Sequence, residues 1–195
     1  MRILNNRIYI VSLFLSVIIF SCSNRDKKTC REGGSLLWVN INHKDSAVKN
    51  AVKQTLENSS IIVAQVSWSP NDNSFFKNTS WYSSLAKNHG KNFMIAVDWQ
   101  KADRSGTKGN WSFNDGKTAE LFKKDMQKLV EAYNPDYINL GVEVNYYALT
   151  SPEGFSSFAS VFRELKQKIK QFKPELKIGL SYQLELLYGK HSEWD

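Results

Sequence analysis

The chain has 195 residues, of which 42% are hydrophobic and 23% charged, an ordinary composition for a globular protein with a single core. The formal net charge is +7, but residues 1–34 hold +4 of it, with six arginines and lysines against Asp26 and Glu32. The remaining +3 shows no basic stripe interleaved with aromatic residues, so we expect no nucleic-acid partner.

The N-terminus has the pattern of an export signal. Two arginines precede thirteen largely apolar residues at Ile8–Phe20, a stretch too short to span a bilayer comfortably. It ends in IFSC at residues 19–22, which resembles a bacterial lipobox, where the signal peptide is removed and the cysteine is acylated. We expect residues 1–21 to be a lipoprotein signal peptide and Cys22 to be lipidated, for example with palmitate. An ordinary secretory signal with an incidental cysteine is the alternative.

Residues 22–34 are polar and end in two glycines, as in a flexible tether. The predicted protein is therefore a bacterial lipoprotein anchored to a membrane through Cys22, periplasmic or at the cell surface, with the outer membrane favoured. With Cys22 lipidated, Cys30 has no disulfide partner in the chain. The spacings CxxC and HExxH do not occur, so we expect no metal and no cofactor.

From residue 35 to residue 195 strand-like and helix-like segments alternate. The predicted strands are Leu36–Asn42, Ile61–Trp68, Asn92–Trp99, Asp136–Asn145 and Lys177–Leu184. The predicted helices run from a cap at Asp45 to about Glu57, over Ser80–Asn88, over Thr118–Tyr133, and from a cap at Ser151 to Pro174. A long polar loop, 101–116, follows the third strand. This alternation predicts βα units around a parallel sheet.

Each predicted strand has one apolar face and one smaller or more polar face. In a doubly wound open sheet both faces pack on helices, and central strands are apolar throughout. In a (β/α)8 barrel the carboxyl ends of the strands build the active site. We therefore expect a TIM-barrel type α/β fold, truncated to about five βα units or completed by another chain. An open doubly wound parallel sheet is the alternative.

The stretch YINLGVEVN at residues 137–145 carries most of the functional prediction. Read as one strand, it puts two kinds of residue on opposite faces. The apolar face holds Ile138, Leu140, Val142 and Val144, and the other face holds Asn139, Gly141, Glu143 and Asn145. Glu143 would then point into the mouth of a barrel. A buried structural glutamate paired with a cation is the alternative.

YINLGVEVN, a following helix, and KIGLSYQLE at residues 177–185 resemble the fourth and fifth strands of clan A glycoside hydrolases. The likeness is greatest to arabinogalactan endo-β-1,4-galactanases and related bacterial proteins. It implies a retaining glycoside hydrolase with Glu143 as general acid/base and a nucleophilic glutamate on a seventh strand, which this chain does not contain. Members usually have asparagine before the acid/base, where this chain has Val142.

We expect a polysaccharide or oligosaccharide as the partner, and five further residues are candidates for binding it: Asp98, Trp111, Asn145, Gln183 and Glu185. Trp68 and Trp99 alternate with helix-facing residues, so packing is favoured for them over sugar stacking. The alternative function is a non-catalytic carbohydrate-binding protein or a degenerate, truncated glycosidase. An aldolase-type barrel is disfavoured because no lysine occupies an inward strand-end position.

Overall fold

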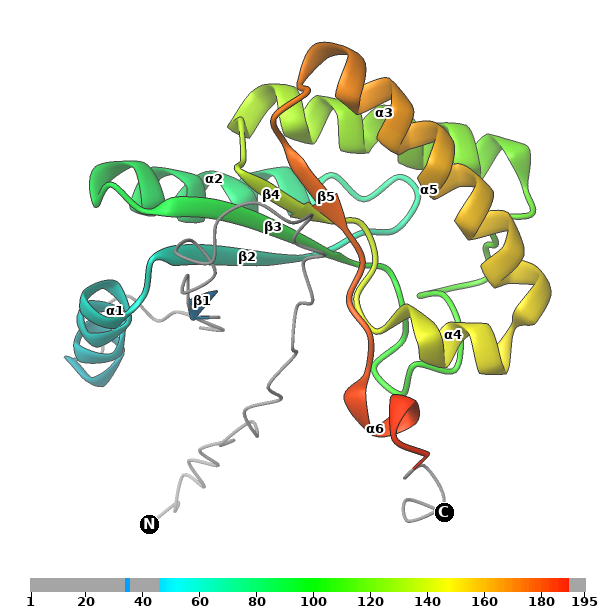
Figure 1. Ribbon diagram of the computed structural model, residues 1–195, viewed down its shortest axis with the longest axis horizontal. Coiled ribbons are helices and arrows are strands. Elements are labelled where there is room, and N and C mark those ends of the chain that lie inside the picture. Colours follow the sequence, from blue (N-terminus) through cyan, green and yellow to red (C-terminus); the bar gives the residue numbers. More distant parts are fainter. Residues whose placement is uncertain (1–33, 36–45, 190–195) are drawn as a thin grey trace, which may run out of the picture.

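The structure is a computed structural model that describes residues 34–35 and 46–189 (Figure 1). Its elements are β1 (Gly34–Ser35), α1 (Ser46–Asn58), β2 (Ile61–Ser67), α2 (Ser74–Asn88), β3 (Asn92–Asp98), α3 (Gly116–Tyr133), β4 (Tyr137–Asn139), α4 (Val144–Thr150), α5 (Pro152–Phe172), β5 (Lys177–Gly179) and α6 (Leu184–Leu187). The predicted first strand and Cys22 lie outside the described residues. Gly34, predicted as the end of the tether, instead belongs to β1.

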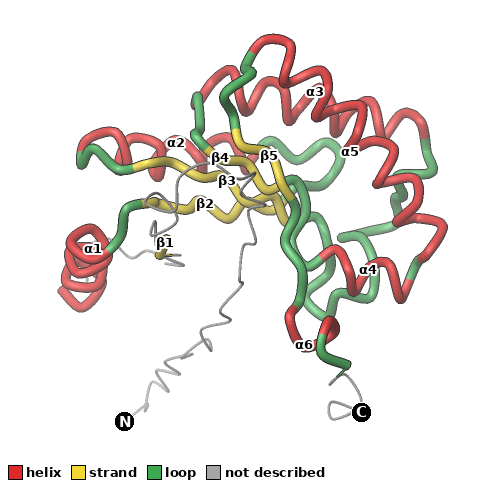
Figure 2. The backbone as a smooth tube through the Cα atoms, viewed as in Figure 1, coloured by secondary structure: helices red, strands yellow, loops and turns green. Residues whose placement is uncertain are grey.

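The five strands form one parallel sheet in the sequential order β1-β2-β3-β4-β5 (Figure 2). Ile61 pairs with Asn92, and Tyr137 pairs with Met94 on one side and Lys177 on the other. The predicted α/β class with a parallel sheet is confirmed. β1 and β5 are the outer strands of this sheet, so the described strands do not close into a barrel.

The two faces of the sheet contribute to two separate hydrophobic clusters. One face is covered by helices, and we call the other the second face. On the helix-covered face, alternate strand residues pack against α2, α3 and α5 (Figure 1); they include Ile62, Val66, Trp68, Ile95, Trp99 and Ile138. On the second face a smaller cluster consists of Ile61, Val63, Met94, Ala96, Tyr137 and Val142. The two-faced pattern predicted for the second and third strands is confirmed. Trp68 and Trp99 are fully buried in the helix-covered core, as packing requires.

Helix α2 begins at Ser74, six residues before the predicted start at Ser80. The segment has weak helix propensity, but Phe75 and Thr79 lie one turn apart on its buried side. Phe75 is completely buried, so tertiary burial outweighs propensity here. The Asp72 side chain also accepts a hydrogen bond from the backbone N–H of Ser74, at 2.8 Å, which supports the earlier start.

Helices α3 and α5 match their predictions closely. α3 is capped by Asp115, whose carboxylate accepts hydrogen bonds from the backbone of Lys117 and Thr118, both at 3.2 Å. These bonds, with one from the Thr118 hydroxyl as the largest contribution, lower the pKa of Asp115. Asn134 ends the helix in a left-handed conformation.

None of the helices within residues 46–189 is long and apolar enough to cross a membrane.

The prediction of one continuous strand over residues 137–145 is wrong. β4 ends at Asn139, a turn follows, and α4 starts at Val144. Leu140 and Val144 pack in the helix-covered core, whereas Val142 packs in the cluster of the second face. Strand alternation therefore does not hold across Gly141. A Cβ on Gly141 would lie 2.5 Å from Val144 Cγ1, so the chain turns where only glycine fits.

The predicted fifth strand is also too long. β5 ends at Gly179, and α6 starts at Leu184, where the prediction still has strand. Backbone hydrogen bonds nevertheless continue beyond the two short strands. The N–H of Leu140 donates to Gly179 at 3.0 Å, and the N–H of Ser181 donates to Gly141 at 3.1 Å. The segments after β4 and β5 therefore stay side by side as they approach their helices.

Gly141→Ala should destabilise the fold by about 1–3 kcal/mol, the usual cost of adding a methyl group to a packed core. The new Cβ would meet Val144 Cγ1 at 2.5 Å and the Phe158 ring at 3.0 Å. Urea denaturation of the full chain measures the loss. Gly179→Ala is the matched control, because no atom lies within 4 Å of a Cβ there. Equal stability of the two variants would contradict the close packing at Gly141.

Candidate active site

Asp98 stands at the carboxyl end of β3, on the second face of the sheet. It is 8% exposed. Its Oδ1 accepts a hydrogen bond from the backbone N–H of Gln100 at 3.1 Å, and its Oδ2 accepts one from Gln65 Nε2 at 3.3 Å. Gln65 lies on the neighbouring strand β2, on the same face. The predicted position of Asp98 at a strand end is therefore confirmed, with its carboxylate fixed by two neutral donors.

Glu143 occupies the turn between β4 and α4, with φ 54° and ψ 43°. This left-handed conformation costs a residue other than glycine about 1–2 kcal/mol. Three hydrogen bonds hold the turn in place. The Glu143 N–H donates to Ser181 Oγ at 3.2 Å, while Gln100 Nε2 donates to the carbonyl of Val142 and, at 3.4 Å, to that of Glu143. Hydrogen bonds from two neighbouring segments thus fix the backbone that carries the glutamate.

Arg104 joins the two carboxylates. Its Nε donates to Glu143 Oε2 at 2.7 Å, and its NH1 donates to Asp98 Oδ1 at 2.7 Å. The three side chains are only 12–18% exposed. Burial by itself lowers the pKa of Arg104, but the two carboxylates outweigh burial and raise that pKa above its ordinary value. The arginine is therefore a permanent cation between Asp98 and Glu143.

Lys108 is a second cation at the same place. Its Nζ donates to Ser67 Oγ at 2.8 Å and to the backbone carbonyl of Asp98 at 3.2 Å, and lies 3.9 Å from Asp98 Oδ2. Burial lowers the pKa of Lys108, Asp98 opposes that change, and repulsion from Arg104 lowers the pKa further. The cluster Asp98–Arg104–Lys108–Glu143, which we call the ionic cluster, thus contains two carboxylates and two basic groups.

The remaining candidate residues lie apart from the ionic cluster or serve the fold. Asn145, on α4, donates from Nδ2 to the carbonyl of Gln183 at 2.8 Å and accepts from its N–H at 2.7 Å, so it ties α4 to the start of α6. The Gln183 Oε1 is buried without a partner in the described part of the chain. Glu185 lies in the first turn of α6. Within residues 46–189 no hydrogen bond or ion pair links it to Glu143.

Trp111 is not a free sugar platform. It is partly buried, and its ring packs edge-on against two other rings. The distance between ring centroids is 5.1 Å to Trp68 and 5.4 Å to Phe113. Its Nε1 donates to the carbonyl of Lys108. Trp111 therefore anchors the loop that carries Arg104 and Lys108 to the helix-covered core.

Sequence reasoning missed Arg104, Lys108 and Gln100. The first two belong to the polar loop after β3, which the sequence marks only as long and charged. Loops that follow parallel strands lie at the same end of the sheet. This rule could have indicated that Arg104 and Lys108 lie near Asp98 and Glu143. Within residues 46–189 there is no group of three or more His, Cys, Asp or Glu residues placed to hold a metal ion.

A scan of protein-family models and a search of curated proteins found no match to the chain.

Arg104→Met should lower the free energy of unfolding by about 2 kcal/mol, because Asp98 and Glu143 would face each other without a shared cation. Lys101→Met is the control, since this exposed lysine lies in the same loop. Chemical denaturation of both variants at neutral pH measures the difference. An Arg104→Met variant as stable as Lys101→Met would show that the bridge contributes nothing.

Proposed function

We propose that the protein is a membrane-anchored bacterial lipoprotein with a glycoside-hydrolase-like barrel that hydrolyses glycosidic bonds in a polysaccharide or oligosaccharide. The observation that carries the proposal is the meeting of Asp98 and Glu143 at the carboxyl ends of adjacent strands, through Arg104. Barrel glycosidases carry their catalytic carboxylates at this end of the parallel sheet, and Glu143 is placed there with Asp98 and Arg104 around it. The resemblance of residues 137–145 and 177–185 to clan A enzymes points to the same function.

The barrel part of this proposal rests on strand order. A doubly wound sheet reverses its order at a switch point and has helices on both faces. Here the order is sequential from β1 to β5, and α2, α3 and α5 pack on one face (Figure 1). Among the described residues, the cluster on the second face contains only strand residues and Val142. These features support an arc of a (β/α)8 barrel whose interior is the second face.

In this proposal Glu143 is the general acid/base. Arg104 Nε is a donor only, so Glu143 Oε2 accepts its hydrogen bond, and the proposal gives the other oxygen, Oε1, the contact with the leaving-group oxygen. Asp98 is a positioning residue. It accepts a hydrogen bond from NH1 of Arg104 and so holds the guanidinium that orients Glu143. Retaining hydrolysis needs a second carboxylate about 5–5.5 Å from the acid/base as nucleophile. In the family that the sequence resembles, that nucleophile is a glutamate on a seventh strand, and we assign the role to none of the described carboxylates.

A non-catalytic carbohydrate-binding protein, or a degenerate glycosidase, is the second candidate. The ion pair to Arg104 favours it, because a carboxylate held by a guanidinium is a stable structural element without any catalytic role. The presence of Val142 before Glu143 also favours it, because this carbon side chain packs in the cluster of the second face and offers no hydrogen bond to a sugar.

Glu143→Gln separates the two candidates. The glutamine keeps an oxygen for Arg104 but has no acidic proton to transfer, so any hydrolysis of galactan and related β-glycans by the wild type should fall about 100-fold or more. Glu131→Gln, at an exposed position of α3, is the control and should keep the wild-type rate. Equal rates for the wild type and Glu143→Gln would remove Glu143 from the mechanism. Glycan binding without turnover by the wild type would favour the second candidate.

Replacement of Cys22 tests the lipid anchor. In the bacterial host, the chain should incorporate radiolabelled palmitate, and Cys22→Ser should abolish the incorporation because the acceptor thiol is lost. Cys30→Ser is the matched control and should remain labelled. Labelling that persists in Cys22→Ser would contradict the lipobox.

A further inference from the structure

Lys108 reaches over the carboxyl ends of two strands. It belongs to the loop after β3, yet its Nζ donates to Ser67 Oγ, at the end of β2, at 2.8 Å and to the backbone carbonyl of Asp98, at the end of β3, at 3.2 Å. Its backbone is fixed as well, because its N–H donates to the carbonyl of Trp99 at 3.0 Å and its carbonyl accepts a hydrogen bond from Trp111 Nε1. The ammonium group is therefore held at this position by contacts within the chain.

Two hydrogen-bond donors at this position have no acceptor among the described residues. An ammonium group has three N–H donors, and the contacts with Ser67 and Asp98 use two of those of Lys108. Asp98 Oδ2 lies 3.9 Å from Nζ, too far for a third hydrogen bond. Ser67 Oγ accepts from Lys108, and within residues 46–189 no acceptor is placed for its own O–H. Ser67 is exposed and the Lys108 side chain is 32% exposed, so a ligand can reach both donors.

The two donors form a fork that fits a carboxylate. Lys108 Nζ and Ser67 Oγ lie 2.8 Å apart, so each can donate to one oxygen of the same carboxylate group. A neutral hydroxyl group offers a single oxygen and no negative charge to the ammonium group. Burial lowers the pKa of Lys108, Asp98 opposes that change, and repulsion from Arg104 lowers the pKa further. An anion beside Nζ would counter both the burial and the repulsion, so the fork favours an acidic group over a hydroxyl.

The charges of the ionic cluster are compatible with an anion at the fork. Asp98 contributes the negative charge closest to Lys108 in the cluster, and its two oxygens already accept hydrogen bonds from Arg104 NH1 at 2.7 Å and from Gln65 Nε2 at 3.3 Å. With Glu143 ionised, the two carboxylates and the two basic groups of the cluster balance. The proposed general acid must carry a proton on Glu143, and one carboxylate then faces two basic groups. The form of the cluster that is ready for hydrolysis is therefore cationic.

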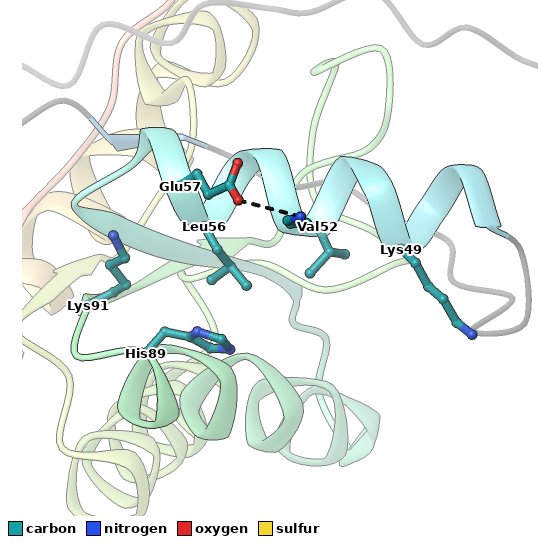
Figure 3. A pocket seen from close by; sticks show the side chains of 7 residues that line it. Lys49, Val52, Leu56, Glu57, His89 and Lys91 are labelled. Carbon is teal, nitrogen blue, oxygen red and sulfur yellow. Dashed lines mark ion pairs between the residues drawn. The ribbon is translucent and has the colours of Figure 1, made fainter.

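A groove elsewhere in the molecule has lysines but no such fork. It lies between α1 and the residues that follow α2, has a volume of about 510 Å³, and is lined in part by three lysines (Figure 3). Lys53 is paired with Glu57 at 3.9 Å. Figure 3 shows Lys49 and Lys91 at opposite ends of the groove, so their amino groups do not converge on one ligand group. The match to a carboxylate is therefore at the ionic cluster and not in this groove.

We propose that Lys108 and Ser67 bind a carboxylate of the glycan, so that the ligand of this site is an acidic polysaccharide containing uronic acid units. The inference rests on the proposed function, because it names the class of glycan that binds at the same site. Strands β2 and β4 are two strand spacings, about 10 Å, apart. The carboxylate at the fork therefore belongs to a sugar unit beside the one that contacts Glu143, and Lys108 and Ser67 determine specificity without taking part in bond cleavage.

Binding of two matched oligosaccharides to the full chain tests the inference. The probes are β-1,4-galactotetraose and the same tetrasaccharide oxidised at C6 to carboxylates, and isothermal titration calorimetry measures both affinities. The wild type should bind the oxidised probe about tenfold more tightly or better, because a hydrogen bond to a charged group contributes more than one between neutral groups. High salt should reduce this preference, because it screens the attraction between the carboxylate and the ammonium group.

Three variants assign the preference to the fork. Lys108→Gln should bind both probes equally, whereas Lys108→Arg keeps the charge and should retain most of the preference. Lys101→Gln, which removes an exposed lysine of the same loop, is the control and should behave as the wild type. Thermal melting checks that each variant is folded.

Equal affinity of the wild type for the two probes, an unchanged preference in Lys108→Gln, or binding of neither probe would overturn the inference. The hydrolysis assay reports on the proposed function separately. Preferred binding of the oxidised probe without turnover would leave the inference standing while hydrolysis fails. Turnover of galactan without the preference would do the reverse.

Discussion

The bridge from Arg104 to Asp98 and Glu143 is the interaction on which the candidate site depends. It joins two segments far apart in the sequence, the end of β3 with its loop and the turn after β4, through two hydrogen bonds of 2.7 Å. Charge-assisted bonds of this length in a largely buried setting are among the stronger polar contacts in proteins. Without the guanidinium, two carboxylates would converge in poorly solvated surroundings, and the Glu143 side chain would lose the cation that orients it.

The framework around the bridge comes from the end of β3. Trp99 Nε1 donates to the carbonyl of Leu140 at 3.1 Å, and the next side chain, Gln100, donates to the carbonyl of Val142. These two bonds fix the path of the chain after β4, so the position of Glu143 depends on its neighbour strand more than on its own. Rigid support of this kind is what a general acid/base needs if its proton is to be delivered at one position.

The sequence predicted well the parts of the fold that local periodicity controls. The alternation of β2 and β3 identified their two faces, and the apolar stripes of α3 and α5 identified their buried sides. It failed at Gly141, where close packing against Val144 and Phe158 shifts the alternation and moves Val142 to the other face. Asp98 and Glu143 were both candidates from the sequence, but Arg104 was not, since contacts between a loop and a distant turn leave no periodic signal.

A double-mutant cycle between Arg104 and Glu143 tests the central claim most directly. The cycle compares the free energies of unfolding of four proteins: the wild type, Arg104→Met, Glu143→Gln and the double variant. It gives the coupling energy of the pair, separated from the effect that each substitution has on its other contacts. The structure predicts a favourable coupling of about 1–3 kcal/mol, because the ion pair is short and largely buried. A coupling near zero would mean that the two side chains act independently and that the ionic cluster is not a unit.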